Sequence, residues 1–141
     1  MKTKIKWDTP TEKFKKWELY ALGEEIFKFC RREVGLTPRG GAYPCLFVHP
    51  RKKSKLYGEY CSNLHMVEIY AGECENLRWF VDTVIHEYVH SCQPWIGVRY
   101  SALNSKVGYR RNPFEVEARR VAKETRTKCI QHLKEKFNSK I

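Results

Sequence analysis

Long apolar stretches are absent from this chain of 141 residues. No run approaches the roughly 20 residues that a membrane-spanning helix needs. The first seven residues, Met1 to Trp7, lack the apolar centre of a secretory signal peptide. We therefore expect a cytoplasmic protein without a membrane segment. Low-complexity tracts, internal repeats and linkers are missing too, so we expect residues 1–141 to form a single domain.

Closely spaced cysteine pairs are also missing, although the chain has six cysteines. The absence of any C-x-x-C pair excludes a zinc ribbon and a thioredoxin-like motif. In a chain without an export signal, cysteines among apolar neighbours are expected to be buried reduced thiols, not a disulfide framework.

Acidic residues are few, with 16 Asp and Glu against 27 Lys and Arg, for a net charge of +11. Such a surface attracts phosphate backbones or acidic protein segments through long-range electrostatics. No nucleic-acid-binding motif accompanies the charge, so a solvated basic surface and nucleic-acid binding both remain open. The basic residues concentrate in residues 2–16, in residues 51–55, in Arg110-Arg111 and along the last predicted helix.

Hydrophobic periodicity predicts an α+β domain in the order helix, three strands, helix, loop, helix. A long amphipathic helix is expected from Thr11 to Val34, with Gly35 ending it. The three strands are expected to form a small antiparallel sheet, with the second and third as a hairpin-like pair. The predicted strands are residues 45–48, 56–60 and 66–70, the second helix is 77–93, the loop is 98–112, and the last helix runs from Asn112-Pro113 towards Phe137.

The second predicted helix contains an H-E-x-x-H motif, His86-Glu87-Tyr88-Val89-His90. Two histidines four residues apart project from the same helical face and can share one cation, while the glutamate can act on a metal-bound water. The motif therefore predicts a zinc hydrolase. Its helical context is supported by Asn76 as a cap and by apolar residues at helical spacing, namely Leu77, Phe80, Val81, Val84, Ile85, Val89 and Cys92.

Catalytic zinc takes three protein ligands and leaves one position to water, so the two histidines need a partner. In a metzincin this would be a histidine six residues after His90, where this chain has Ile96. The SprT-like pattern, with a histidine soon after the motif, is also disfavoured, because no histidine lies between Ser91 and Gln131.

Two glutamates at the start of the last helix, Glu115 and Glu117, are the remaining candidates for the third ligand. Residues two apart on a helix point roughly 200° away from each other, so only one of them can bind the same ion. Both flank the apolar stripe of the helix, and periodicity does not choose between them.

The motif together with the segment Tyr109 to Ala118 resembles small gluzincin metallopeptidase domains. These pair H-E-x-x-H with Tyr-x-x-x-Pro-x-Glu-x-Glu-Ala, are frequent among phage-encoded and bacterial peptidases, and are distantly similar to ImmA/IrrE-type proteases and thermolysin. The resemblance covers about residues 56–125 and implies a zincin-like fold. It also implies that the Glu-Ala glutamate, Glu117, is the third ligand, with Glu115 as the alternative.

The predicted activity is hydrolysis of peptide bonds in a protein or peptide substrate by one Zn²⁺ held by His86, His90 and Glu117. Glu87 is the predicted general base. Tyr109 is predicted to supply a hydroxyl to the developing oxyanion.

Other readings of these features remain open. For Tyr100, aromatic packing is the favoured reading over a role as the oxyanion donor. The strand from Met66 to Tyr70 could bind an extended substrate by edge pairing, or it could equally be central in its sheet. The whole chain could instead be a basic nucleic-acid-binding protein with a non-catalytic zinc site, or a protease acting on DNA-associated proteins. A purely structural zinc site is disfavoured, because such sites are usually closed cages of four ligands rich in cysteine, and this chain has no closely spaced cysteine pair.

Overall fold

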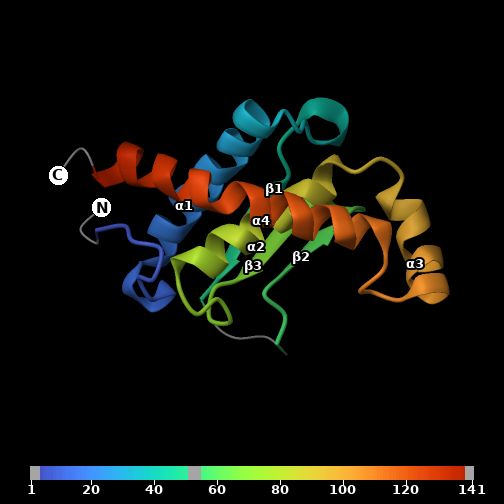
Figure 1. Cartoon of the computed structure of the whole chain (residues 1–141), viewed down its shortest axis with the longest axis horizontal. Helices are drawn as coiled ribbons and strands as arrows, with labels where there is room; N and C mark the ends of the chain where they lie inside the picture. The colour runs from blue at the N-terminus through green and yellow to red at the C-terminus, as the bar shows by residue number, and fades with distance from the viewer. Residues whose placement is uncertain (1–3, 51–54, 139–141) are drawn as a thin grey trace.

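The computed structural model describes residues 4–50 and 55–138, and it confirms the predicted α+β class. In these residues four α-helices accompany a three-stranded sheet (Figure 1). Short 3-10 and π-helical turns occur as well, and one of them extends α1 to Val34. The elements are α1 (Lys16–Phe29), β1 (Cys45–His49), β2 (Gly58–Cys61), β3 (Met66–Tyr70), α2 (Leu77–Cys92), α3 (Ile96–Val107) and α4 (Pro113–Leu133).

The sheet has the strand order β1-β3-β2, and it is mixed. β2 and β3 pair antiparallel as predicted, but β1 runs parallel to β3, so the prediction of an antiparallel sheet is wrong for β1. Alternation of side chains reveals which residues share a face of a strand, but it carries no information on strand direction. Of the two positions left open for β3, the structure shows the central one, and β2 is an edge strand.

α2 is the central helix of the core. It contacts α1, α4, β2 and β3, and the predicted cap is confirmed, since the Asn76 side chain accepts a hydrogen bond from the backbone N–H of Trp79 at 3.2 Å. The Tyr88 hydroxyl is satisfied by the carbonyl of Leu36 at 2.6 Å. The apolar side chains predicted to face inward are buried, including Leu77, Phe80, Val81, Val84, Ile85 and Val89.

α3 replaces the loop that the sequence predicts for residues 98–112. This prediction is wrong because α3 lacks the buried stripe on which periodicity depends. Of its 12 residues only Ile96 is buried, and Val98 is 74% exposed. Figure 1 shows α3 projecting beyond the body of the molecule, next to the start of α4.

α4 begins as predicted, with Pro113 in its first turn and the Asn112 side chain accepting from the N–H of Phe114 at 3.0 Å. The helix packs along α2. In the π-helical turn that follows α4, the side-chain oxygen of Asn138 accepts a hydrogen bond from the N–H of Ile5 at 3.1 Å. The C-terminal end of this helical segment therefore lies beside the N-terminal part of the chain.

The cysteines are free, and the prediction of buried reduced thiols is confirmed for Cys30, Cys74 and Cys129. Burial raises the pKa of the Cys30 thiol to about 12. Cys45 is exposed, and the remaining two are half-buried. Within residues 4–50 and 55–138, no helix combines the length and apolar character needed to cross a membrane.

Candidate metal centre

The two histidines of the motif lie one turn apart on α2 and face the same side, as predicted. Their ring centroids are 4.9 Å apart, with the planes at 81°. His90 is almost completely buried, whereas 14% of the His86 side chain is exposed. The pair therefore sits at the boundary between the core and solvent.

Glu115, in the first turn of α4, reaches both rings with one carboxylate oxygen. Its Oε1 lies 2.8 Å from Nε2 of His86 and 3.1 Å from Nε2 of His90. Among the described residues, these three form the one cluster of His, Cys, Asp and Glu that could hold a metal ion, with ligand atoms within 4.8 Å of one another. The structure thus joins the motif on α2 to a glutamate on α4.

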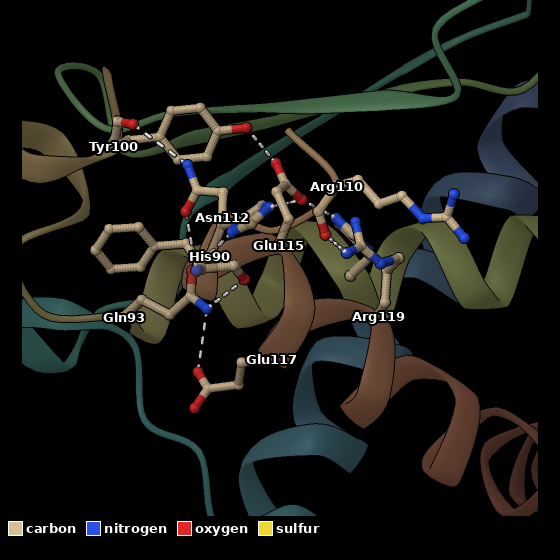
Figure 2. Close-up of polar contacts among 10 residues, drawn as sticks. His90, Gln93, Tyr100, Arg110, Asn112, Glu115, Glu117 and Arg119 are labelled. Atoms are coloured by element: carbon tan, nitrogen blue, oxygen red, sulfur yellow. Dashed lines mark hydrogen bonds and ion pairs between the residues drawn. The ribbon is translucent and has the colours of Figure 1, made fainter. Parts of the chain in front are cut away.

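Glu117, which the resemblance implies as the third ligand, lies away from the histidines, whereas Glu115 contacts both of them. The Glu117 carboxylate accepts a hydrogen bond from Nε2 of Gln93 at 3.0 Å, and Figure 2 shows it pointing away from Glu115. Glu115 is only 4% exposed and precedes the buried Ala118 by three residues. Because Glu117 likewise precedes the buried Val121 by four residues, helical periodicity alone does not distinguish the two glutamates.

Gln93, which the sequence analysis does not single out, fixes the orientation of His90. Its side-chain Nε2 donates to the carbonyl of Phe114 at 2.8 Å and to Glu117 at 3.0 Å. Its Oε1 therefore faces Nδ1 of His90, at 2.7 Å, and accepts a hydrogen bond from the Nδ1–H group. This contact directs the Nε2 lone pair of a neutral His90 towards Glu115.

Two acceptors, a neutral imidazole nitrogen and a carboxylate oxygen, repel each other unless a proton or a cation lies between them. The pKa shifts of Glu115 and His90 are consistent with a positive charge between these atoms. Burial alone would raise the pKa of Glu115, but its contacts with His86 and His90 outweigh burial and hold the pKa well below its usual range. Burial lowers the pKa of His90, but the interactions with Glu115, Glu87 and Gln93 together outweigh burial and raise it. The cluster therefore suits either protonated histidines or a metal ion.

Tyr100 on α3 holds the other oxygen of Glu115. Its hydroxyl donates to Oε2, and its ring stacks on Phe114 with centroids 6.2 Å apart. The side chain of Asn112 in turn donates to the Tyr100 carbonyl at 3.3 Å (Figure 2). Tyr100 therefore packs against an aromatic ring as expected, and its hydroxyl in addition orients the carboxylate.

Tyr109 lines a cavity that also includes the two histidines and Glu115. In the part of the chain that the structure describes, its hydroxyl makes no hydrogen bond to Glu115. The residue is 57% exposed, and the guanidinium of Arg119 lies over its ring at 5.8 Å. Burial of its hydroxyl and the nearby carboxylates raise the pKa of Tyr109, so the hydroxyl stays protonated at neutral pH and is able to donate.

Glu87 lines a cavity of about 380 Å³ together with the two histidines and Glu115. The residue is 7% exposed, and burial raises its pKa. β2 closes one side of the cavity and approaches α2 closely at Gly58, where a Cβ atom would lie 2.8 Å from Thr83 Cγ2 and 3.2 Å from Glu87 Cγ. A glycine is needed here for the strand and the helix to approach. Leu56, Tyr60, Ser62, Ile96, Gly97 and Ser101 complete most of the wall.

Comparison with known proteins adds no assignment: no family model matches this chain, and neither does any curated protein sequence or solved structure. The chemistry of the site must be argued from its own residues.

Proposed function

We propose that this protein is a zinc metallopeptidase of zincin-like architecture, with His86, His90 and Glu115 as ligands of one Zn²⁺. The observation that carries the proposal is the convergence of two imidazole Nε2 atoms on one carboxylate oxygen, beside the cavity that contains Glu87. The resemblance of the sequence to gluzincins supports the same conclusion, with Glu115 in place of Glu117.

The donor set fits zinc in number and spacing. Zinc bonds of about 2.0–2.2 Å in tetrahedral geometry place neighbouring donor atoms about 3.3–3.6 Å apart. The carboxylate oxygen of Glu115 lies 2.8 and 3.1 Å from the two ring nitrogens, and all three ligand atoms lie within 4.8 Å of one another, so shifts of about 1 Å or less would bring them to zinc spacing. Three protein ligands next to an open cavity are typical of a catalytic zinc site, whereas structural sites are closed by four.

A zinc ion in such a site lowers the pKa of its bound water from 15.7 to about 7 and polarises a substrate carbonyl. Glu87, in the same cavity, is placed to accept the proton of the attacking water on its carboxylate and to deliver it to the leaving amine. Tyr109 can donate its hydroxyl to the oxyanion. Tyr100 and Gln93 keep Glu115 and His90 in position.

The peptide would lie along β2, which borders the cavity and is an edge strand of the sheet. Edge strands bind extended peptides through backbone hydrogen bonds. This assigns to β2 the role that the sequence analysis gives to the central strand β3.

Metal analysis of purified variants tests the proposal. We expect one zinc per chain in the wild type and in Glu117→Gln, and loss of most of the zinc in Glu115→Gln, because only Glu115 contacts the histidines. The two substitutions change charge equally and lie two residues apart on one helix. Equal retention of zinc in both variants, or loss only in Glu117→Gln, would contradict the ligand set.

A further inference from the structure

A second cavity, of about 620 Å³, lies at the other end of α4. It is formed by Trp7 from the N-terminal segment, Arg78 from the start of α2, and the face of α4 between Thr127 and Lys134. Figure 1 shows the N-terminal segment near the C-terminal part of α4, while α3 and the start of α4 lie at the opposite end. Thirteen helical residues separate Glu115 from Lys128, or about 20 Å along the axis, so the two cavities are distinct.

The charged residues that line this groove are all positive, namely Arg78, Lys128 and Lys134. The nearest acidic side chain of α2, Asp82, is paired with Arg126 at 2.9 Å and does not line the groove. On a chain of net charge +11, this concentration favours an anionic partner.

Trp7 presents an aromatic surface to the same groove. It is 52% exposed although it is among the largest apolar side chains. Its backbone is fixed, since its carbonyl accepts from the N–H of Arg78 at 2.8 Å. The guanidinium of Arg78 lies over the ring of Trp79 at 5.2 Å, which restrains the cation beside Trp7. The groove thus combines a restrained exposed indole with three cations.

We propose that this groove binds single-stranded nucleic acid, with a base stacked on Trp7 and phosphates near Arg78, Lys128 and Lys134. Stacking on aromatic side chains in a positively charged groove is how proteins bind single strands without reading sequence. A duplex hides the faces of its bases, so Trp7 favours the single strand. The inference does not depend on the proposed peptidase activity, because it uses none of the residues of the metal centre.

Fluorescence anisotropy of a labelled oligothymidylate, measured at several salt concentrations, tests this binding. Trp7→Ala should weaken binding about tenfold and leave the salt dependence unchanged, because stacking releases no counterions. The double variant Lys128→Gln/Lys134→Gln should reduce the slope of log K against log salt by about 1.4, since each phosphate contact on a single strand contributes about 0.7. Trp7→Phe should retain most of the affinity.

Matched controls come from exposed residues outside the groove. Trp17→Ala removes another indole, which is 62% exposed on α1, and Lys28→Gln/Lys106→Gln removes two exposed lysines. We expect both controls to bind within about twofold of the wild type, and His90→Ala to bind normally. No binding by the wild type, equal losses in the control variants, or equally tight binding of a duplex of the same length would overturn the proposal.

Discussion

Two clusters of histidine and glutamate lie at opposite ends of α4, and they neutralise a buried carboxylate in different ways. At the far end, Glu25 of α1 accepts from Nε2 of His132 at 2.7 Å and from Lys136 at 2.9 Å. Glu115 has contacts of similar length, but two imidazoles and a phenol are its partners.

The difference lies in where the positive charge comes from. Lys136 carries a permanent charge to Glu25, which is 5% exposed, so that cluster is complete as an ion pair. Glu115 has two histidines and a tyrosine as its partners, with no lysine or arginine among them, and the cluster opens onto a cavity. This difference is why we propose a metal site at Glu115 and an ion pair at Glu25. The three predictions below test this contrast.

The largest effect is expected for Glu87→Gln. It removes the general base but no ligand, so hydrolysis of a peptide substrate should fall at least a hundredfold while the zinc content stays at one per chain. The same substitution in the ion-pair cluster, Glu25→Gln, should leave the turnover number within about twofold. Comparable losses in both variants, measured with an unstructured protein such as casein, would contradict the assignment of chemistry to one cluster alone.

A smaller effect is expected for Gln93→Leu, which removes the acceptor that orients His90. Outer-shell partners of metal ligands typically contribute 10- to 100-fold in metal affinity, and we expect a loss in that range. Competition with a chromogenic zinc chelator would measure it. Gln131→Leu, a change to an exposed glutamine on α4, serves as the control. Unchanged zinc affinity in Gln93→Leu would show that the contact with His90 does not position the ligand.

The smallest effect is expected for the stability of Glu25→Gln. Burial would raise the pKa of Glu25, but the hydrogen bonds from His132 and Lys136 outweigh it and lower the pKa below 4.5. Its charge therefore stabilises the fold fully above the unfolded-state pKa, and this contribution is lost as the pH falls through the lowered folded-state pKa. The variant should lose about 2 kcal/mol at pH 7 and progressively less below about pH 4.

Urea unfolding at several pH values, with and without a zinc chelator, measures this contribution. The exposed neighbour Glu24→Gln is the matched control and should be close to the wild type. The loss in Glu25→Gln should be the same with and without chelator, because this cluster needs no metal. A loss that grows as the pH falls would contradict the ion-pair description.

The same contrast explains how much the sequence can reveal. The H-E-x-x-H helix is predictable because its signals are local: a cap at Asn76, a buried stripe and two histidines one turn apart. The start of α4 at Asn112 is predictable for the same reason. α3 is not, since 11 of its 12 residues lie outside the core and leave no periodic pattern.

The third ligand depends on information that is only partly local. The turn geometry of α4 shows that Glu115 and Glu117 cannot both reach one ion, but the packing of α4 against α2, two segments distant in sequence, decides which of them lies beside the histidines. Gln93 escapes detection because its role requires Phe114 and Glu117, which lie more than 20 residues away in sequence. Likewise, the direction of β1 is set by its pairing with β3, not by its own residues.

The central claim is tested most directly by crystals of the zinc-loaded protein, with anomalous diffraction recorded at the zinc absorption edge. We expect one anomalous peak about 2.0–2.2 Å from Nε2 of His86, Nε2 of His90 and a carboxylate oxygen of Glu115, with the fourth position open to the cavity. A peak ligated by Glu117, a cage closed by a fourth protein ligand, or no peak between the two rings would contradict it.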